Sequence, residues 1–330
     1  MNPLIDDTRY MNSNHLKGTA LVDDLGPDYT VETLYLARDI TATLVSLPAN
    51  PDVPTRGAML YLHGFIDYFF HDHVARHFAD QGWSWYALDL RRNGRSLRPG
   101  QEPWYVGELS EYYEEIDLSM QRIRDDGHTN IVLIGHSTGG LTAAMWAHDR
   151  GAARSISALV LNSPWLDLQM PWFMRTIGTW AVRAVAKIRP LANIPQAFVG
   201  VYPESLNRTA KGEWEFNTRW KPLTSQAVKY GFLATVRAHH ARLHRGIDVG
   251  VPVLMLRSDK SLLGLTAWDD GARSADIVLN VDQMEEWLPK IGTDVTDAPL
   301  KGAMHDVFLS EQSVREKALT TIDEWLARRS

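Results

Sequence analysis

The sequence predicts an α/β fold in which a mostly parallel, doubly wound sheet carries helices on both faces. Two β-rich runs open the chain, strand patterns then alternate with helix patterns, and one segment of about 80 residues interrupts the alternation. Strands that alternate with helices are joined by right-handed crossovers, which set the strands parallel. The 330 residues suffice for one large domain with an insertion.

The first half of the chain supplies six strand patterns. The runs at 31–37 and 40–48 are rich in β-branched residues around a short polar break, and they predict an antiparallel pair. Four further apolar runs predict buried strands at 58–62, 83–90, 130–135 and 156–163. Helix patterns separate these strands at 73–81, 109–123 and 138–148.

The segment 165–246 suspends the alternation after the sixth strand. It is rich in Trp, Phe and Arg, and it is too long for a simple loop. We therefore expect a helical cap at 165–246, inserted into a core formed by 1–164 and 247–330. The core pattern resumes with a strand at 251–258, a helix at 281–289, a strand at 293–301 and a final helix at 310–329.

Composition excludes several classes of protein. The net charge of −6 argues against a protein that binds nucleic acid. No apolar run reaches the length of about 18 residues that a membrane span requires. The absence of cysteine excludes disulfides, thiolate metal sites and a cysteine nucleophile. The N-terminus lacks the basic and apolar pattern of a secretory signal, so we expect a cytoplasmic protein.

The predicted cap differs from the core in charge. It holds twelve Lys and Arg against four Asp and Glu, together with many aromatic residues. One interpretation is an acyl-binding hood whose basic face makes transient contact with anionic lipid. The other is a helical subdomain that packs its own core, with arginines that are solvated or paired to the acidic core.

The sharpest motif is Gly135-His136-Ser137-Thr138-Gly139, which lies between a buried strand and an apolar helix. A turn this tight excludes larger side chains at the glycine positions, and it presents the serine hydroxyl at the carboxyl end of the strand. Ser137 is therefore the predicted nucleophile.

A serine nucleophile needs a histidine to take its proton and a carboxylate to orient the imidazole. His305 is the histidine that follows the last predicted strand, so it is the expected base. The acid must lie between Ser137 and His305, after the strand at 251–258. Asp276 and Asp259 are the main candidates, and Asp269, Asp270 and Asp282 are remoter ones.

An oxyanion also needs two backbone N–H donors, and their expected sources are Thr138, which follows the nucleophile, and Phe65, which follows the strand at 58–62. The pairs His73/His77 and His240/His244 have the spacing of helical metal ligands. The glutamate of a zinc-peptidase helix is missing, so we interpret both pairs as surface or loop histidines and expect no metal.

From about Tyr29 onward the chain resembles α/β-hydrolases of the monoacylglycerol lipase and lysophospholipase type. The resemblance rests on HG at 63–64, GHSTGG at 135–140, the cap after SPW, and GAMHD at 302–306. It implies the α/β-hydrolase fold and an acid about thirty residues before the base, which favours Asp276 over Asp259. The interposed residues SLLGLTAWDDGARS and the segment DLRRNGRS depart from the family pattern.

The predicted function is therefore that of a serine carboxylesterase or lipase without a cofactor. Its substrates would be esters with an apolar acyl chain, such as a monoacylglycerol or a lysophospholipid, and His136, Trp165 and Trp172 are the expected substrate-binding residues. The same constellation serves peptidases, acyltransferases and perhydrolases. A non-catalytic module that binds a small molecule under the cap is the alternative from another class.

Overall fold

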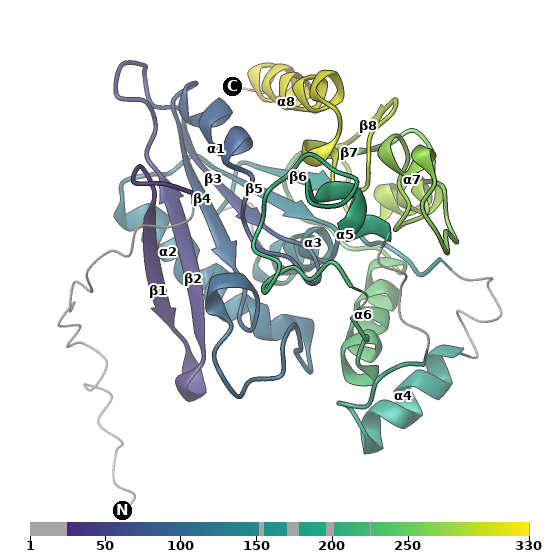
Figure 1. Cartoon of the computed structure of the whole chain (residues 1–330). Helices are drawn as coiled ribbons and strands as arrows, with labels where there is room; N and C mark the ends of the chain where they lie inside the picture. The colour runs from purple at the N-terminus through teal and green to yellow at the C-terminus, as the bar shows by residue number, and fades with distance from the viewer. Residues whose placement is uncertain (1–24, 152–154, 170–177, 196–200, 225, 330) are drawn as a thin grey trace, which may run out of the picture.

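The computed structural model describes residues 25–329 except 152–154, 170–177, 196–200 and 225. Eight strands form one sheet in the order β1-β2-β4-β3-β5-β6-β7-β8 (Figure 1). The predicted doubly wound, mostly parallel sheet is confirmed. Within the described residues, no helix combines the length and the apolarity needed to cross a membrane.

The N-terminal strands form the predicted antiparallel pair. β1 (Thr30–Tyr35) pairs with β2 (Thr41–Leu47), and β2 pairs antiparallel with β4 (Trp83–Asp89). All later neighbours are parallel; these strands are β3 (Gly57–Leu62), β5 (Ile131–His136), β6 (Ala158–Asn162), β7 (Val253–Ser258) and β8 (Val295–Leu300). Because their carboxyl ends share one edge, residues that follow these strands converge there.

Helices cover both faces of the sheet (Figure 1). α1 (Asp72–Ala79) and α8 (Gln312–Ala327) pack on one face, where Phe78 and Trp325 join the core. The opposite face packs against α2 (Tyr113–Asp125), α3 (Thr138–Arg150) and α7 (Val281–Trp287). Every residue of β3 to β7 is buried, as expected for parallel strands covered on both sides.

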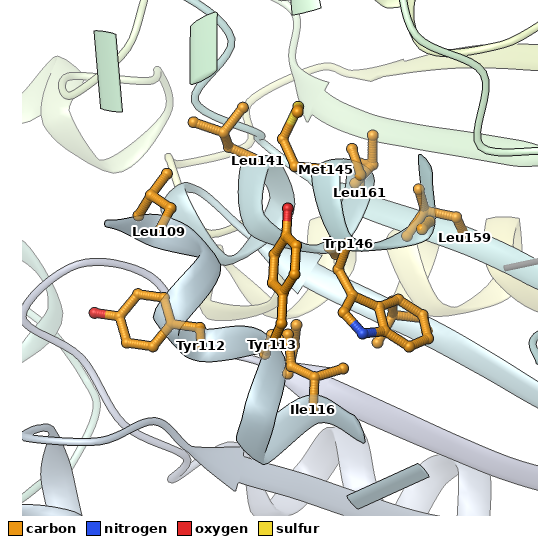
Figure 2. Packing of buried hydrophobic residues seen from close by; sticks show 14 of the residues in the cluster. Leu109, Tyr112, Tyr113, Ile116, Leu141, Met145, Trp146, Leu159 and Leu161 are labelled. Atoms are coloured by element: carbon orange, nitrogen blue, oxygen red, sulfur yellow. The ribbon is translucent and has the colours of Figure 1, made fainter. Parts of the chain in front are cut away.

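Figure 2 shows the packing between α2, α3 and β6. Side chains of α2 and the preceding turn (Leu109–Tyr112) meet side chains of α3, and those of β6 lie beyond them. Trp146 of α3 is buried, and its indole N–H donates to Asp117 of α2 at 2.8 Å. This packing holds α3 in place behind the turn at Ser137.

A buried ion pair fastens α2 to the loop after β4. Nε and Nη2 of Arg91 donate to the two carboxylate oxygens of Glu115 at 3.0 and 2.6 Å, and the Glu115 side chain is fully buried. Glu114 is a second partner of Arg91 at 2.8 Å. Neither Arg91 nor Glu115 is among the residues that line the cavity described below.

The segment between β6 and β7 contains three described helices, α4 (Thr179–Ile188), α5 (Val201–Leu206) and α6 (Tyr230–Leu243). α4 packs against α6, and α6 sends Phe232 and Val236 into the main hydrophobic core. α5 lies over the carboxyl edge of the sheet (Figure 1). At least this helix of the insertion therefore lies at the edge where the residues after the parallel strands converge.

Candidate active site

Ser137 occupies the turn between β5 and α3. Its φ of 52° and ψ of −116° lie where residues with a Cβ are rarely found, so the turn holds Ser137 under backbone strain. The Ser137 amide donates to the carbonyl oxygen of Asn162, at the end of β6, at 3.0 Å. Ser137 lies in the wall of a cavity.

Gly135 and Gly139 allow this turn to form. A Cβ on Gly139 would lie 2.3 Å from the carbonyl oxygen of His63, and a Cβ on Gly135 would lie 2.7 Å from that of Gly139. The obstructing atoms are backbone and cannot rotate away. Only glycine lets the start of α3 pack so closely against the ends of β3 and β5.

His305 and Asp276 meet at the same edge of the sheet. Nδ1 of His305 donates to Oδ2 of Asp276 at 2.8 Å, and both side chains are buried. Oδ1 of Asp276 accepts from the amides of Val278 and Leu279 at 2.8 and 2.7 Å. With its proton on Nδ1, the imidazole keeps the Nε2 lone pair that a general base needs.

Asp276 reaches this position because the chain returns to the end of β7 after an excursion. The Asp276 amide donates to the carbonyl of Lys260 at 3.0 Å, and the Leu262 amide donates to the carbonyl of Asp276 at 2.8 Å. The residues between Leu262 and Asp276 therefore form a closed loop. The inserted residues therefore lengthen the sequence before Asp276 without moving Asp276 away from the end of β7.

The alternative acids lie elsewhere. Asp259 is exposed, and its carboxylate accepts from the Gly302 amide at 3.1 Å. The three remoter candidates are also exposed, namely Asp269, Asp270 and Asp282. Among the five carboxylates considered, the partner of His305 in the structure is Asp276.

The residues predicted to supply the oxyanion donors line the same cavity as Ser137 and His305. Thr138 is the first residue of α3, where helix N–H groups lack intrahelical partners and the dipole is positive. Phe65 follows β3, and its ring stacks on Phe232 of α6 with a centroid distance of 4.4 Å. Both residues therefore lie at the carboxyl edge of the sheet, in the wall of the cavity that Ser137 and His305 line.

The cavity has a volume of about 660 Å³ and lies between the sheet edge and the insertion. Apolar side chains from both parts form much of its wall, including Trp165, Val201, Pro222, Val228, Leu265 and Ile277. Leu265 belongs to the excursion before Asp276. A cavity of this size and character fits a small organic ligand with an apolar part.

Two of the residues predicted to bind substrate, His136 and Trp165, line this cavity. Nδ1 of His136 donates to the carbonyl of Asn162 at 3.1 Å. Burial lowers the pKa of His136 to about 4, so its ring is neutral at pH 7. The third residue, Trp172, lies outside the described residues.

The cavity wall also contains a buried ion pair that the sequence did not predict. Oδ1 of Asp67 lies 2.7 Å from Nζ of Lys221, and the side chains are 3% and 5% exposed. Burial raises the pKa of Asp67, but the Lys221 charge and nearby histidines outweigh burial and lower it. The ammonium also lies over the rings of Phe70 and Tyr202. No local motif signals this pair, because its members are far apart in the sequence.

The histidine pairs with metal-ligand spacing have protein partners. Nε2 of His73 donates to a main-chain carbonyl, and that of His77 to a carboxylate, both at 2.8 Å. Nε2 of His240 and of His244 donate to carbonyls at the start of the insertion, also at 2.8 Å. The prediction of surface or loop histidines is therefore wrong for His73 and His77, which are half-buried on α1, and for His240, which is fully buried on α6.

The described residues include one close group of three potential metal ligands, Asp67, His136 and Asp306. Their ligand atoms lie within 4.8 Å of one another. Asp67 is already neutralised by Lys221, and Asp306 accepts two side-chain hydrogen bonds. These contacts account for the buried carboxylates without a cation.

Fold and site together define an α/β-hydrolase. A strained serine turn after the fifth strand and a histidine–aspartate pair at the same sheet edge are the arrangement of that class. The family model described as serine aminopeptidase, S33, matches residues 53–262, which is more than half of the chain. The chain therefore belongs to this family of hydrolases.

Similarities to individual proteins confirm the resemblance to the monoacylglycerol lipase type. A monoacylglycerol lipase of Mycolicibacterium smegmatis is 32% identical over 119 residues, a match that spans 35% of this chain and 40% of that relative. The chain thus matches less than half the length of this curated relative.

Two solved structures share the fold at low sequence identity. The monoacylglycerol lipase of Paleococcus ferrophilus is 21% identical with a TM-score of 0.64, covering 87% of this chain and 98% of that one. A soluble variant of monoglyceride lipase from Saccharomyces cerevisiae is 15% identical with a TM-score of 0.70, covering 95% and 99%. At these identities both are evidence for the fold alone.

The contacts of the two aspartates lead to a first prediction. Asp276→Asn removes the acceptor that selects the His305 tautomer, so kcat for a p-nitrophenyl ester should fall by about 10³- to 10⁴-fold. Asp259→Asn is the matched control and should leave kcat within about twofold of the wild type, because surface substitutions rarely perturb a site. A large loss at Asp259 alone would contradict the assignment.

The close packing at Gly139 leads to a second prediction. Gly139→Ala forces a Cβ against the His63 carbonyl. The turn should then shift, and kcat for the p-nitrophenyl ester should fall by about 100-fold or more. Gly178→Ala is the control, because a Cβ at Gly178 meets nothing within 4 Å. Steady-state kinetics and thermal unfolding of both variants check the prediction, and equal activities would show that the turn tolerates the methyl group.

Proposed function

We propose that the protein is a serine carboxylic-ester hydrolase in which Ser137 attacks the ester and carries the acyl group. The observation that carries the proposal is the shared cavity wall. Ser137 and His305 both line the cavity, and His305 is hydrogen-bonded to the buried Asp276. A serine, an oriented imidazole and a carboxylate are the groups that acyl transfer to serine requires.

The proposed reaction has two steps. Nε2 of His305 takes the proton of Ser137 as the hydroxyl attacks, and Asp276 stabilises the resulting imidazolium. The amides of Phe65 and Thr138 donate to the oxyanion. His305 then protonates the leaving alcohol, and a water molecule activated by His305 cleaves the acyl-enzyme. Neither step requires a cofactor.

The cavity favours an ester with an apolar acyl chain. Its apolar wall can take the chain, whereas Asp67 and Lys221 offer polar groups to the other end of the molecule. The names of the similar lipases support a monoacylglycerol as substrate. A lysophospholipid or another ester of an apolar acid fits the same cavity.

The family description gives a specific reason to test a second chemistry. The matching family is described as serine aminopeptidase, and a peptidase would use the same nucleophile and base. Acyltransferase and perhydrolase reactions and a non-catalytic binding module are further alternatives. The apolar wall favours the ester, because a free amino terminus would need a carboxylate to bind it and the Asp67 carboxylate in the wall is already paired with Lys221.

A labelling experiment tests the nucleophile. Wild-type protein should react with a fluorophosphonate probe and hydrolyse p-nitrophenyl esters of a chain-length series, whereas Ser137→Ala should do neither. Ser119→Ala, a buried serine of α2, is the matched control and should behave as wild type. Equal labelling of wild type and Ser137→Ala would refute the proposed nucleophile, and no labelling of either would favour the binding module.

We further propose that residues 165–246 act as a cap over this site and that their basic surface makes transient contact with anionic lipid. On α4 and just after it, Trp180, Ile188 and Leu191 are 72%, 82% and 49% exposed. Arg183 and Lys187 are exposed on the same helical face, as their spacing from Trp180 requires. Exposed aromatic and aliphatic groups beside cations suit a membrane interface.

Vesicle sedimentation tests the lipid contact. The protein should bind phosphatidylcholine vesicles that contain phosphatidylglycerol about tenfold more tightly than neutral vesicles, since each basic residue contributes about 1 kcal/mol near an anionic surface. Arg183→Glu combined with Lys187→Glu should remove the difference, and Lys317→Glu, on the exposed surface of α8, should not. Equal binding to both vesicle types would contradict the proposal.

A further inference from the structure

We propose that Asn162 and Asp306 are positioning residues: the main chain of Asn162 holds the turn of Ser137, its side chain holds Asp306 in the turn of His305, and together they set the separation of nucleophile and base. This inference rests on the ester-hydrolase function proposed above. It concerns two buried polar side chains that the two-step reaction does not use directly.

Asn162 contacts both turns. Its main-chain carbonyl accepts from the Ser137 amide at 3.0 Å and from Nδ1 of His136 at 3.1 Å. Its side-chain Nδ2 donates to Oδ1 of Asp306 at 2.7 Å, and its Oδ1 accepts from the Val307 amide at 3.1 Å. One residue at the end of β6 therefore holds the nucleophile turn through its backbone and the base turn through its side chain.

Asp306 directly follows His305 and is fully buried. Besides Asn162, its Oδ1 accepts from the Phe308 amide at 3.0 Å, and its Oδ2 accepts from Nε2 of His71 at 2.8 Å. Burial raises the pKa of Asp306, but the surrounding histidines and hydrogen-bond donors outweigh burial and lower it. The group is therefore a carboxylate that fixes the turn after the base from several directions.

The insertion holds the base turn from the other side. The Asp306 amide donates to the hydroxyl of Tyr202 at 3.2 Å, and the Tyr202 ring packs edge-on against His305 with a centroid distance of 5.4 Å. Because Asn162 of the core and Tyr202 of the insertion both bond to this turn, the turn has little freedom to move along the sheet edge.

The contacts distinguish positioning from catalysis. The residues that line the described cavity include Ser137 and His305 but neither Asn162 nor Asp306, so the bridge acts on the reacting groups without touching substrate. A displacement of about 1 Å between reacting groups can cost about 100-fold in rate. The bridge should therefore affect kcat more than KM.

A swap of the two side chains tests the bridge. Asn162→Asp alone sets two carboxylates against each other, and kcat for a short-chain p-nitrophenyl ester should fall by about 10- to 100-fold with KM within about twofold. In Asn162→Asp with Asp306→Asn, the new amide donates to the new carboxylate and its oxygen still accepts from His71, and the only bond of this network that is lost is the one from the Phe308 amide. The double variant should recover to within about threefold of wild-type kcat, as coupled partners do.

Two further variants separate positioning from loss of folded protein. All rates are divided by the active sites titrated with the fluorophosphonate probe, and the rate of Ser137 phosphonylation is measured alongside. Glu115→Gln breaks a buried carboxylate contact away from the cavity, so it should lower stability but not kcat per site. Asn162→Ser removes the side-chain amide without adding a charge. If the Asn162→Asp protein cannot be produced in folded form, Asn162→Ser should show the same loss of kcat.

The outcomes separate the two proposals. Wild-type kcat per site in Asn162→Asp and Asn162→Ser, or a double variant as slow as Asn162→Asp, would overturn the bridge while the esterase proposal stands. A wild type that is phosphonylated at Ser137 but hydrolyses no ester would overturn the ester proposal, and the phosphonylation rates would still decide the bridge. Failure of Ser137 to react at all would overturn both.

Discussion

The close approach of α3 to the ends of β3 and β5 constrains the whole carboxyl edge of the sheet. Gly139 packs against the His63 carbonyl with no room for a Cβ, and the chain must therefore turn at Ser137 in a strained conformation. Packing of α3 against α2 and β6 offsets this strain (Figure 2). Every other group at the site has to be brought to the point where this turn ends.

The groups brought there are largely buried, and burial explains how they are connected. An ionised side chain out of water is costly unless charges or hydrogen bonds compensate it. Asp276 is compensated by His305 and two amides, and Asp67 by Lys221. Because Lys221 comes from the insertion, the need to pair charges also joins the insertion to the core.

Much of the architecture could be predicted because it depends on local patterns. Apolar runs predicted the described strands, including the antiparallel opening pair, and helix periodicity predicted the helices between them. The observed boundaries differ from the predicted ones by a few residues. The motif around Ser137 predicted a strand, a turn and a helix, which is what the chain forms. Chain order singled out His305, since one histidine follows the last strand.

Contacts between distant segments could not be predicted in this way. The sequence by itself determined the alternation of strands and helices and the tight turn at Ser137, because each follows from the properties of neighbouring residues. Only the tertiary structure decided that Asp276 contacts His305, that Asp67 pairs with Lys221 and that Asn162 meets Asp306. These pairs depend on how strand ends and loops come together in space, which local periodicity does not encode.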